Sequence, residues 1–185
     1  QPALARKFVD WVLDPETSAA ISNYTYYGNP NARAQALLDR LGTVPARLSA
    51  AADLQDAVAR ADIIATTTMA RAPVIRGDWV RPGTHVDLIG AYRPDMREAD
   101  DEVLRRARLF VDSRATTIGH IGEIQAPLDQ GVIRESDILG DFYDLPAGAY
   151  CRRSDDEITV AKNGGGAHLD LMTSRYILDA WKAAK

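Results

Sequence analysis

The sequence is poor in cysteine, in basic charge and in long apolar runs, and each shortage excludes a class of protein. Its one cysteine, Cys151, has no second cysteine with which to form a disulfide within the chain. A net charge of -4 over 185 residues leaves no basic surface of the kind that binds nucleic acid. No apolar run approaches the roughly 20 residues that span a bilayer, and the first residues do not form a charged and then apolar leader. We therefore expect a cytoplasmic protein that binds neither nucleic acid nor membrane.

Histidine is also scarce, and its spacing argues against a metal site. The three histidines, His85, His120 and His168, are too far apart to supply the close ligand pairs of a zinc site. Ser113 is not surrounded by a nucleophile-elbow motif. We therefore expect neither a bound metal nor hydrolysis by a serine triad.

Two kinds of pattern divide the chain near residue 31. Residues 1–31 predict two short helices, over 2–13 and 15–23. Apolar side chains recur at helical spacing in the first, and Pro15 suits the first position of the second. A turn rich in Tyr, Asn and Gly follows. We expect a short helical segment over 1–31 and a separate domain over 32–185.

From residue 32 onward, short apolar runs alternate with helical periodicity. Runs rich in β-branched residues predict strands, and the amphipathic stretches between them predict helices. Strands are expected at 62–68, 84–91, 108–113 and 157–163, helices at 52–62, 99–107 and 166–184, and helical or mixed segments at 119–131 and 135–145. Such alternation indicates an α/β protein with a parallel sheet and flanking helices. The residues expected to lie buried in adjacent strands are Ile63, Ile64, Val86, Leu88, Ile89, Leu109, Phe110, Val111, Ile158 and Val160.

Small and polar residues follow each predicted strand. These stretches are TTTMAR (66–71), GAYRPDMRE (90–98), DSRAT (112–116) and KNGGGAH (162–168). The carboxyl ends of parallel strands share one edge of a sheet, and ligands of α/β proteins bind there. Small side chains let a flat ligand approach the backbone, and glycines before a helix leave amide groups for an anion or a carboxamide. Ordinary strand-to-helix turns are the alternative.

The turn GAYRPDMRE is the most highly charged. Arg93 and Arg97 follow the strand closely, where a guanidinium could bind a phosphate or a carboxylate. Glu98 and the acidic residues 100–102 come at the start of the next predicted helix, where the helix dipole favours negative charge. We interpret most of these acids as helix-stabilising residues and Arg93 as a candidate substrate-binding residue.

The stretch ADIIATTTMARAPVIRGDWVRPGTHVDLIGAYRPDMREADDEVL closely resembles the ornithine cyclodeaminase and mu-crystallin family, and NGGGAHLDL resembles that family's late strand-to-helix turn. The match runs from about Arg33 to Lys185, and GAYRPDMREADDE is most similar to the mu-crystallin and cyclic-ketimine-reductase branch. The resemblance implies a partial Rossmann-like domain that binds NAD(P), with a small amino or imino acid as ligand. It places the nicotinamide side of the cofactor beside Thr66, Thr67, Thr68, Gly90, Ala91, Asn163, Gly164 and Gly165.

Two departures from the family pattern shape the functional expectation. Where cyclodeaminases have an aspartate after two glycines, this chain has Gly90, Ala91 and Tyr92. This difference favours NAD(P)-dependent reduction of cyclic imino acids, of the pyrroline-carboxylate or ketimine type, over amino-acid deamination. The glycine-rich turn expected just before residue 30, which holds the cofactor pyrophosphate, is missing, and so is the family's substrate domain. We therefore expect impaired activity and weak NAD(P) binding.

Residues 1–31 instead resemble the C-terminal part of periplasmic spermidine/putrescine-binding proteins, through the turn YYGNPN in particular. The chain would then join two unrelated pieces near Asn31 to Arg33. Three hypotheses stay open: an NAD(P)-dependent enzyme, a non-catalytic chimeric or truncated fragment and, less favoured, a polyamine-binding module. An open first edge of the sheet would favour a homo-oligomer.

Overall fold

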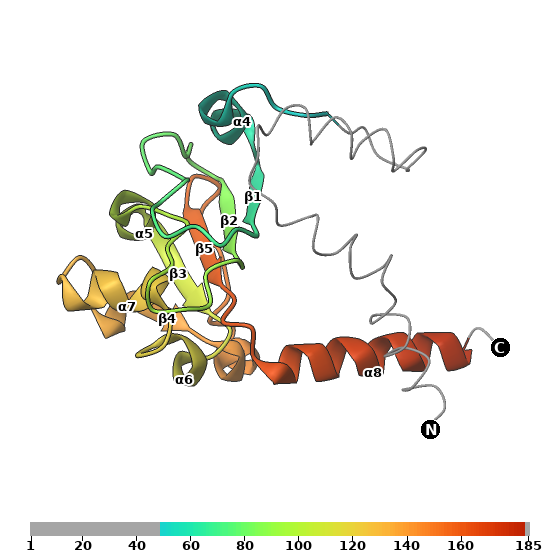
Figure 1. Cartoon of the computed structure of the whole chain (residues 1–185). Helices are drawn as coiled ribbons and strands as arrows, with labels where there is room; N and C mark the ends of the chain where they lie inside the picture. The colour runs from blue at the N-terminus through green and yellow to red at the C-terminus, as the bar shows by residue number, and fades with distance from the viewer. Residues whose placement is uncertain (1–48, 184–185) are drawn as a thin grey trace. The chain divides into compact units, whose positions relative to one another are not determined.

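A computed structural model of the protein describes residues 49–183, which contain a five-stranded sheet with flanking helices (Figure 1). The helices predicted at 2–13 and 15–23 lie outside the described residues. In chain order the elements are α4 (Leu54–Arg60), β1 (Ile63–Thr66), β2 (His85–Leu88), α5 (Asp101–Arg106), β3 (Ala107–Val111), α6 (Arg114–Thr117), α7 (Gly122–Asp129), the 3-10 helix η1 (Glu135–Asp137), β4 (Ile138–Gly140), the 3-10 helix η2 (Phe142–Ala147), β5 (Ile158–Lys162) and α8 (Ala167–Ala183).

All strand pairs in the sheet are parallel, in the order β1-β2-β5-β3-β4. The last strand of the chain, β5, therefore lies between β2 and β3. This arrangement confirms the α/β class and the parallel sheet expected from the sequence. Strand β4 was not predicted, because three residues are too few to show the alternation of a strand, and the segment 135–145 was interpreted as helical or mixed.

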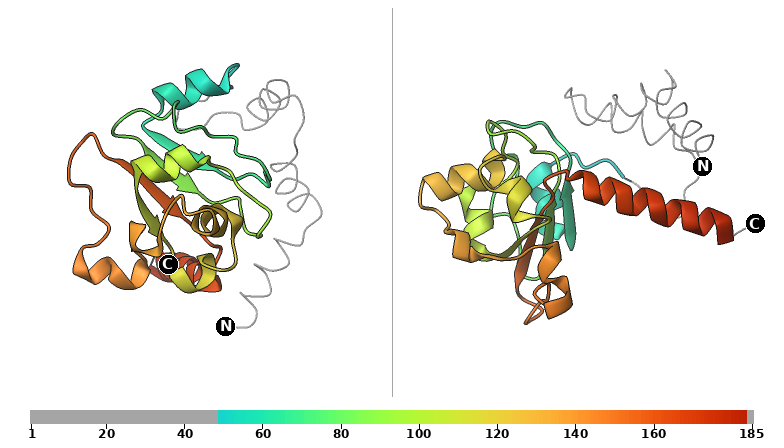
Figure 2. Two further views of the ribbon diagram at one scale, coloured as in Figure 1. Left: turned by 90° about the vertical axis from the view of Figure 1, so that its left-hand side faces the viewer. Right: turned by 90° about the horizontal axis from the view of Figure 1, so that it is seen from below.

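One buried residue from each strand lines up across the sheet and forms the centre of the core. Ile64 pairs with Val86, and Val86 with Val160. Val160 also pairs with Leu109, which pairs with Ile138. These side chains pack in one apolar cluster with buried residues of α5 and α7, and Figures 1 and 2 show both helices on the same side of the sheet. Burial of each such side chain contributes about 1.5–3 kcal/mol, so the apolar row fixes the register of the strands.

Two residues predicted to lie in the core are exposed. Ile63 is 71% exposed, because β1 is the outermost of the described strands and side chains alternate between the two faces of a sheet, so that Ile63 points away from the face that buries Ile64. Ile89 follows the last residue of β2 and is 38% exposed. The other predicted core residues are buried.

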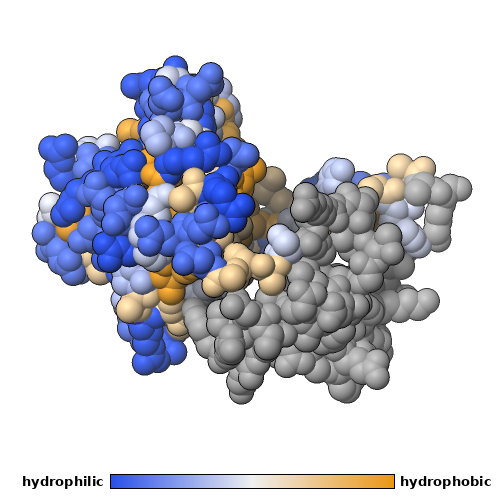
Figure 3. All heavy atoms as spheres, turned by 90° about the horizontal axis from the view of Figure 1, so that it is seen from above, coloured by the Kyte–Doolittle hydropathy of each residue, from blue (hydrophilic) through white to orange (hydrophobic). Residues whose placement is uncertain are grey.

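Hydrophilic residues cover most of the coloured surface in the view of Figure 3. Within residues 49–183, no helix combines the length and the apolar character needed to cross a membrane. Helix α8 nevertheless exposes several large apolar side chains: Leu171, Met172, Tyr176, Ile177 and Trp181.

Candidate functional site

Strands β1, β2 and β5 end in one row at the carboxyl edge of the sheet. Thr66 pairs with Leu88, and Leu88 pairs with Lys162, so the last residues of the three strands are neighbours. This row lies two residues beyond the apolar row of the core, on the same face of the sheet. The turns that follow the three strands therefore start side by side.

Backbone hydrogen bonds connect these turns. The N–H group of Gly90 donates to the carbonyl oxygen of Thr66 at 3.1 Å. The N–H group of Asn163 donates to the carbonyl oxygen of Leu88 at 3.0 Å. The structure thus brings together the turns at 66–68, 90–91 and 163–165 that were grouped from the sequence.

Gly90 has no room for a side chain. A β-carbon there would lie 2.1 Å from both the backbone nitrogen and the carbonyl oxygen of Thr68, and 2.4 Å from Oε1 of Glu98. Because backbone atoms cannot move aside as a flexible side chain can, only glycine lets the turns after β1 and β2 touch.

The glycine turn after β5 packs against the turn after β3. A β-carbon on Gly164 would lie 3.0 Å from Oγ1 of Thr116 and 3.1 Å from Oδ1 of Asp112. Gly165 has a φ of +74°, in the left-handed region that favours glycine, and its N–H group donates to Oδ1 of Asn163 at 2.8 Å. The fourth stretch selected from the sequence, DSRAT, therefore also lies at this edge.

A buried carboxylate holds the first two turns together. Glu98 is 0% exposed. Its Oε1 accepts hydrogen bonds from the N–H group and the hydroxyl of Thr68, at 2.6 and 2.8 Å. Its Oε2 accepts from the hydroxyl of Thr66 at 2.8 Å and from the N–H groups of Gly90 and Ala91 at 2.7 and 3.2 Å. Hydrogen bonds to an ionised acceptor are the strong ones, so this carboxylate firmly connects the two turns.

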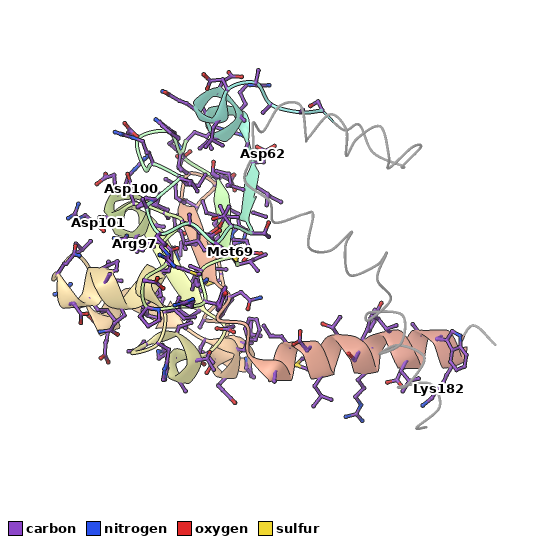
Figure 4. All side chains as sticks on the ribbon, in the orientation of Figure 1. Asp62, Met69, Arg97, Asp100, Asp101 and Lys182 are labelled. Atoms are coloured by element: carbon purple, nitrogen blue, oxygen red, sulfur yellow. The ribbon has the colours of Figure 1, made fainter. Side chains whose placement is uncertain are left out.

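Glu98 is not one of the acids that stabilise the start of the helix. Helix α5 begins at Asp101, and Asp100 is its N-cap, with a carboxylate that accepts from the N–H groups of Val103 at 3.0 Å and Gly77 at 2.9 Å. Figure 4 shows Asp100 and Asp101 beside α5. The sequence could not separate Glu98 from these acids, because all of them precede or open the same helix.

Lys162 connects β5 to the turn after β2. The residue is 1% exposed, and its Nζ donates to the carbonyl oxygens of Leu88 at 3.0 Å and Ala91 at 2.6 Å. Burial lowers the pKa of Lys162, and nearby carboxylates, that of Glu123 above all, oppose this shift. The ammonium group thus supplies a counter-charge for the buried carboxylates and two hydrogen bonds for the edge.

Glu123, in the first turn of α7, supports Glu98 through the backbone. Its carboxylate accepts from the N–H groups of Glu98 at 2.5 Å and Ala99 at 3.0 Å. Burial raises the pKa of Glu123, and these two N–H groups oppose the shift. We refer to Glu98, Glu123 and Lys162 as the edge cluster. None of the three was selected as a site residue from the sequence.

Arg93 lies on the exposed side of the same edge. Its Nε is 3.3 Å from the carboxylate of Asp95, which also pairs with Arg71 at 3.1 Å. Exposed ion pairs of this kind contribute about 0–1 kcal/mol, so Arg93 can exchange Asp95 for another anion. Arg97 is different, because its half of the turn folds back toward α5, where it pairs with Asp101 at 2.8 Å (Figure 4).

Sequence comparison identifies a family and several relatives of this chain. The model of the ornithine cyclodeaminase/mu-crystallin family matches residues 17–185, and so begins inside the segment 1–31. The Delta(1)-pyrroline-2-carboxylate reductase of Paracoccus denitrificans is 60% identical over 146 residues, which cover 78% of this chain and 46% of that protein. The ketimine reductase mu-crystallin of Mus musculus is 36% identical over 146 residues, which cover 77% of this chain and 43% of that protein.

Two solved structures are similar to this chain in fold and sequence. The Delta(1)-pyrroline-2-carboxylate reductase of Thermococcus litoralis, in complex with NADH and L-proline, matches with a TM-score of 0.64 and 29% identity, over 83% of this chain and 43% of that one. An archaeal alanine dehydrogenase dimer with bound NAD matches with a TM-score of 0.64 and 34% identity, over 78% of this chain and 43% of that one. The chain thus spans less than half the length of each of these relatives.

Proposed function

Because the chain belongs to the ornithine cyclodeaminase/mu-crystallin family, we propose that it forms the nicotinamide-binding edge of an NAD(P)-dependent reductase of cyclic imino acids. The proposed substrates are of the pyrroline-carboxylate and ketimine type, as the names of its relatives suggest. The observation that carries the proposal is that the turns at 66–68, 90–91 and 163–165 meet at one edge of the sheet and are tied by the edge cluster.

The chemistry of this edge fits a nicotinamide group. The three turns consist largely of glycine, alanine and threonine, so a flat ring can approach the backbone. Thr67, Met69 and Ile89 are exposed on the first two turns, and Figure 4 places Met69 just past the end of β1. They offer a hydroxyl and apolar surface of the kind that holds a ring with a polar amide. A reduced nicotinamide cofactor, when bound, supplies the hydride for imine reduction.

Tyr92, which stands where cyclodeaminases have their aspartate, supports reduction rather than deamination. It is 56% exposed and carries a phenol in place of a carboxylate, so the group for which the family's deaminases use an aspartate is absent at this position. Arg93, a short distance along the same turn, is the proposed partner for the carboxylate of the imino acid, because its exposed guanidinium pairs with Asp95 at the surface and can reach an anionic ligand.

Titration of the full chain with NADH and NADPH, followed by the fluorescence of the reduced ring, tests the proposal. We expect saturable binding that is lost in Gly90→Ala, and consumption of NADH that depends on added Delta(1)-pyrroline-2-carboxylate. Equal signals from wild type and Gly90→Ala would contradict the proposal and favour a non-catalytic fragment.

We further propose that copies of the chain associate. Two observations support this: the exposed apolar side chains of α8, and the dimeric state of the archaeal alanine dehydrogenase. Sedimentation of wild type and of Tyr176→Lys, which places a charge on a residue that is now exposed, tests it. A wild-type chain that stays strictly monomeric at high concentration would contradict the proposal.

A further inference from the structure

We propose that Glu98 is a positioning residue that fixes the turn after β1 against the turn after β2, and so shapes the surface that would meet the nicotinamide ring. The identity of that ligand rests on the proposed function. The tie between the two turns rests on the structure alone, and the two can be tested separately.

The hydrogen bonds of Glu98 divide between the two turns. Oε1 faces the N–H group and hydroxyl of Thr68, in the turn after β1. Oε2 faces the N–H groups of Gly90 and Ala91 in the turn after β2, and also the hydroxyl of Thr66 at the end of β1. Every partner is a donor, so the carboxylate accepts hydrogen bonds from both turns at once. A small change at this group therefore affects both turns together.

The backbone of Glu98 is itself held firmly. Its N–H group donates to Glu123 at 2.5 Å, and its carbonyl oxygen accepts from the N–H groups of Val74 and Ile75, each at 2.9 Å. These contacts come from α7 and from the loop after β1, on the covered side of the sheet. A side chain whose main chain is fixed in this way can set the geometry of its neighbours, because it has no freedom to follow them.

The surroundings of Gly90 show how closely the two turns approach each other beside Glu98. A β-carbon on Gly90 would lie 2.4 Å from Oε1 of Glu98 and 2.1 Å from the backbone of Thr68. Gly90 thus lies against both the backbone of Thr68 and the carboxylate of Glu98. A shift of this carboxylate therefore shifts the surface that the two turns form. Lys162, which donates to the carbonyl oxygen of Ala91, holds the same turn from the side of β5.

Glutamine is the sharp test at position 98, because it keeps the shape of glutamate and replaces one acceptor by an NH₂ donor. If that NH₂ takes the place of Oε1, it faces the N–H group of Thr68, and if it takes the place of Oε2, it faces those of Gly90 and Ala91. The threonine hydroxyls can rotate to accept, but the backbone N–H groups cannot. In either orientation of the amide, one of the two turns therefore loses hydrogen bonds to residue 98.

The experiment compares wild type, Glu98→Gln and the matched control Glu102→Gln, all as the full chain. Glu102 undergoes the same chemical change but is half-exposed in α5 and pairs only loosely with Arg105, at 3.9 Å. Two quantities are measured: amide hydrogen exchange across the described segments, and the dissociation constant for NADH. Thr66→Val provides a second variant, since it removes one donor to the same carboxylate without a change of shape.

We expect Glu98→Gln to accelerate exchange in 66–70 and 89–92 and to raise the NADH dissociation constant about tenfold, with Thr66→Val following in the same direction and Glu102→Gln unchanged. Exchange in β3 should stay at the wild-type rate, which shows that the variant is folded. Wild-type exchange in both turns of Glu98→Gln would overturn the proposal, and so would faster exchange with unchanged NADH affinity.

A failure of the proposed function gives a different result. If the wild-type chain does not bind NADH, the proposed ligand is wrong, whatever Glu98→Gln does. Hydrogen exchange then decides the role of Glu98 alone, since faster exchange in both turns supports the tie and unchanged exchange refutes it.

Discussion

Lys162 and Leu88 lie opposite each other on neighbouring strands, and the ammonium group of the first donates to the carbonyl oxygen of the second at 3.0 Å. The pair lies two residues beyond Val86 and Val160, which are apolar partners in the centre of the core. A charged side chain therefore occupies a position where the core pattern would place an aliphatic one. The carboxyl edge of the sheet is thus held by charge and hydrogen bonds.

Lys162→Met should be strongly destabilising, although it preserves most of the volume of the side chain. The carbonyl oxygens of Leu88 and Ala91 each lose one donor, and the buried carboxylates lose a nearby positive charge. Removal of one partner from such a buried arrangement costs about 3–5 kcal/mol. Urea denaturation measures the change in the free energy of unfolding. Lys182→Met, on the exposed surface of α8, is the control and should change stability by less than about 0.5 kcal/mol. Equal free energies of unfolding for the two variants would show that Lys162 does not stabilise the fold.

Gly90→Ala should push the turns after β1 and β2 apart. The new β-carbon would overlap the backbone of Thr68, and overpacking of this kind costs about 1–3 kcal/mol. Gly119→Ala is a useful comparison, because Gly119 has a φ of +79° but open space around it. It should therefore cost only the backbone strain, about 1–2 kcal/mol. We expect NADH affinity to fall in Gly90→Ala and to be retained in Gly119→Ala. NADH affinity that is retained in Gly90→Ala and lost in Gly119→Ala would contradict the proposed location of the cofactor site.

Stability should fall in mild acid because of His85. This residue lies on the face of the sheet opposite the core row, where its Nδ1 is 2.8 Å from Oγ1 of Thr159. Burial lowers the pKa of His85, while the charge of Asp87 opposes the shift and that of Arg152 adds to it. The unfolded chain then binds more protons than the folded chain between the lowered pKa and the ordinary value near 6.5. The contribution is present above that value and is lost as the pH falls through the lowered pKa.

His85→Gln should remove this part of the pH dependence. The measurement is the free energy of unfolding of wild type and variant at about pH 7 and about pH 5, on either side of an ordinary histidine pKa. Because His85 is only half-buried, the difference between the two pH profiles should stay below about 1 kcal/mol. Parallel profiles would mean that another group causes the acid sensitivity.

Asp100→Ala should weaken the start of α5. The carboxylate caps the helix at Val103 and also accepts from the N–H group of Gly77, so its loss leaves two backbone donors without this partner. Loss of an N-cap costs about 0.5–2 kcal/mol, and the second bond should place this variant near the upper end. Asp100→Asn keeps an acceptor oxygen and should cost less. Equal costs for the two variants in thermal unfolding would show that the cap bonds contribute little.

The sequence predicted those parts of the fold that depend on local pattern. The α/β class and four strands could be predicted because runs such as the one around Val86 are apolar, β-branched and bounded by turns. Periodicity also shows which residues share a face, but it cannot show which strand lies at an edge. The burial predicted for Ile63 was wrong for that reason, since the strand order leaves β1 with only one described neighbour.

The edge cluster depends on contacts between distant segments, and so it was missed. Lys162 and Leu88 are 74 residues apart in the chain, and they meet only because β5 lies next to β2. One signal was present in the sequence: Lys162 continues the alternation of Ile158 and Val160, which places a lysine on the core face of a strand. Glu98 offered no such signal, because it stands next to the acidic residues at the start of a predicted helix and could not be distinguished from them.

The position of β5 in the middle of the sheet has a consequence for biosynthesis. Among the described strands, β2 and β3 are joined only through β5, which follows the other four in the chain. Before the chain reaches Ile158, the described strands can form two separate pairs, β1 with β2 and β3 with β4, and two-stranded pairs are marginal on their own. The chain must therefore be made as far as Lys162 before the described sheet can close, and until then the sides of β2 and β3 that β5 will cover are open to other strands.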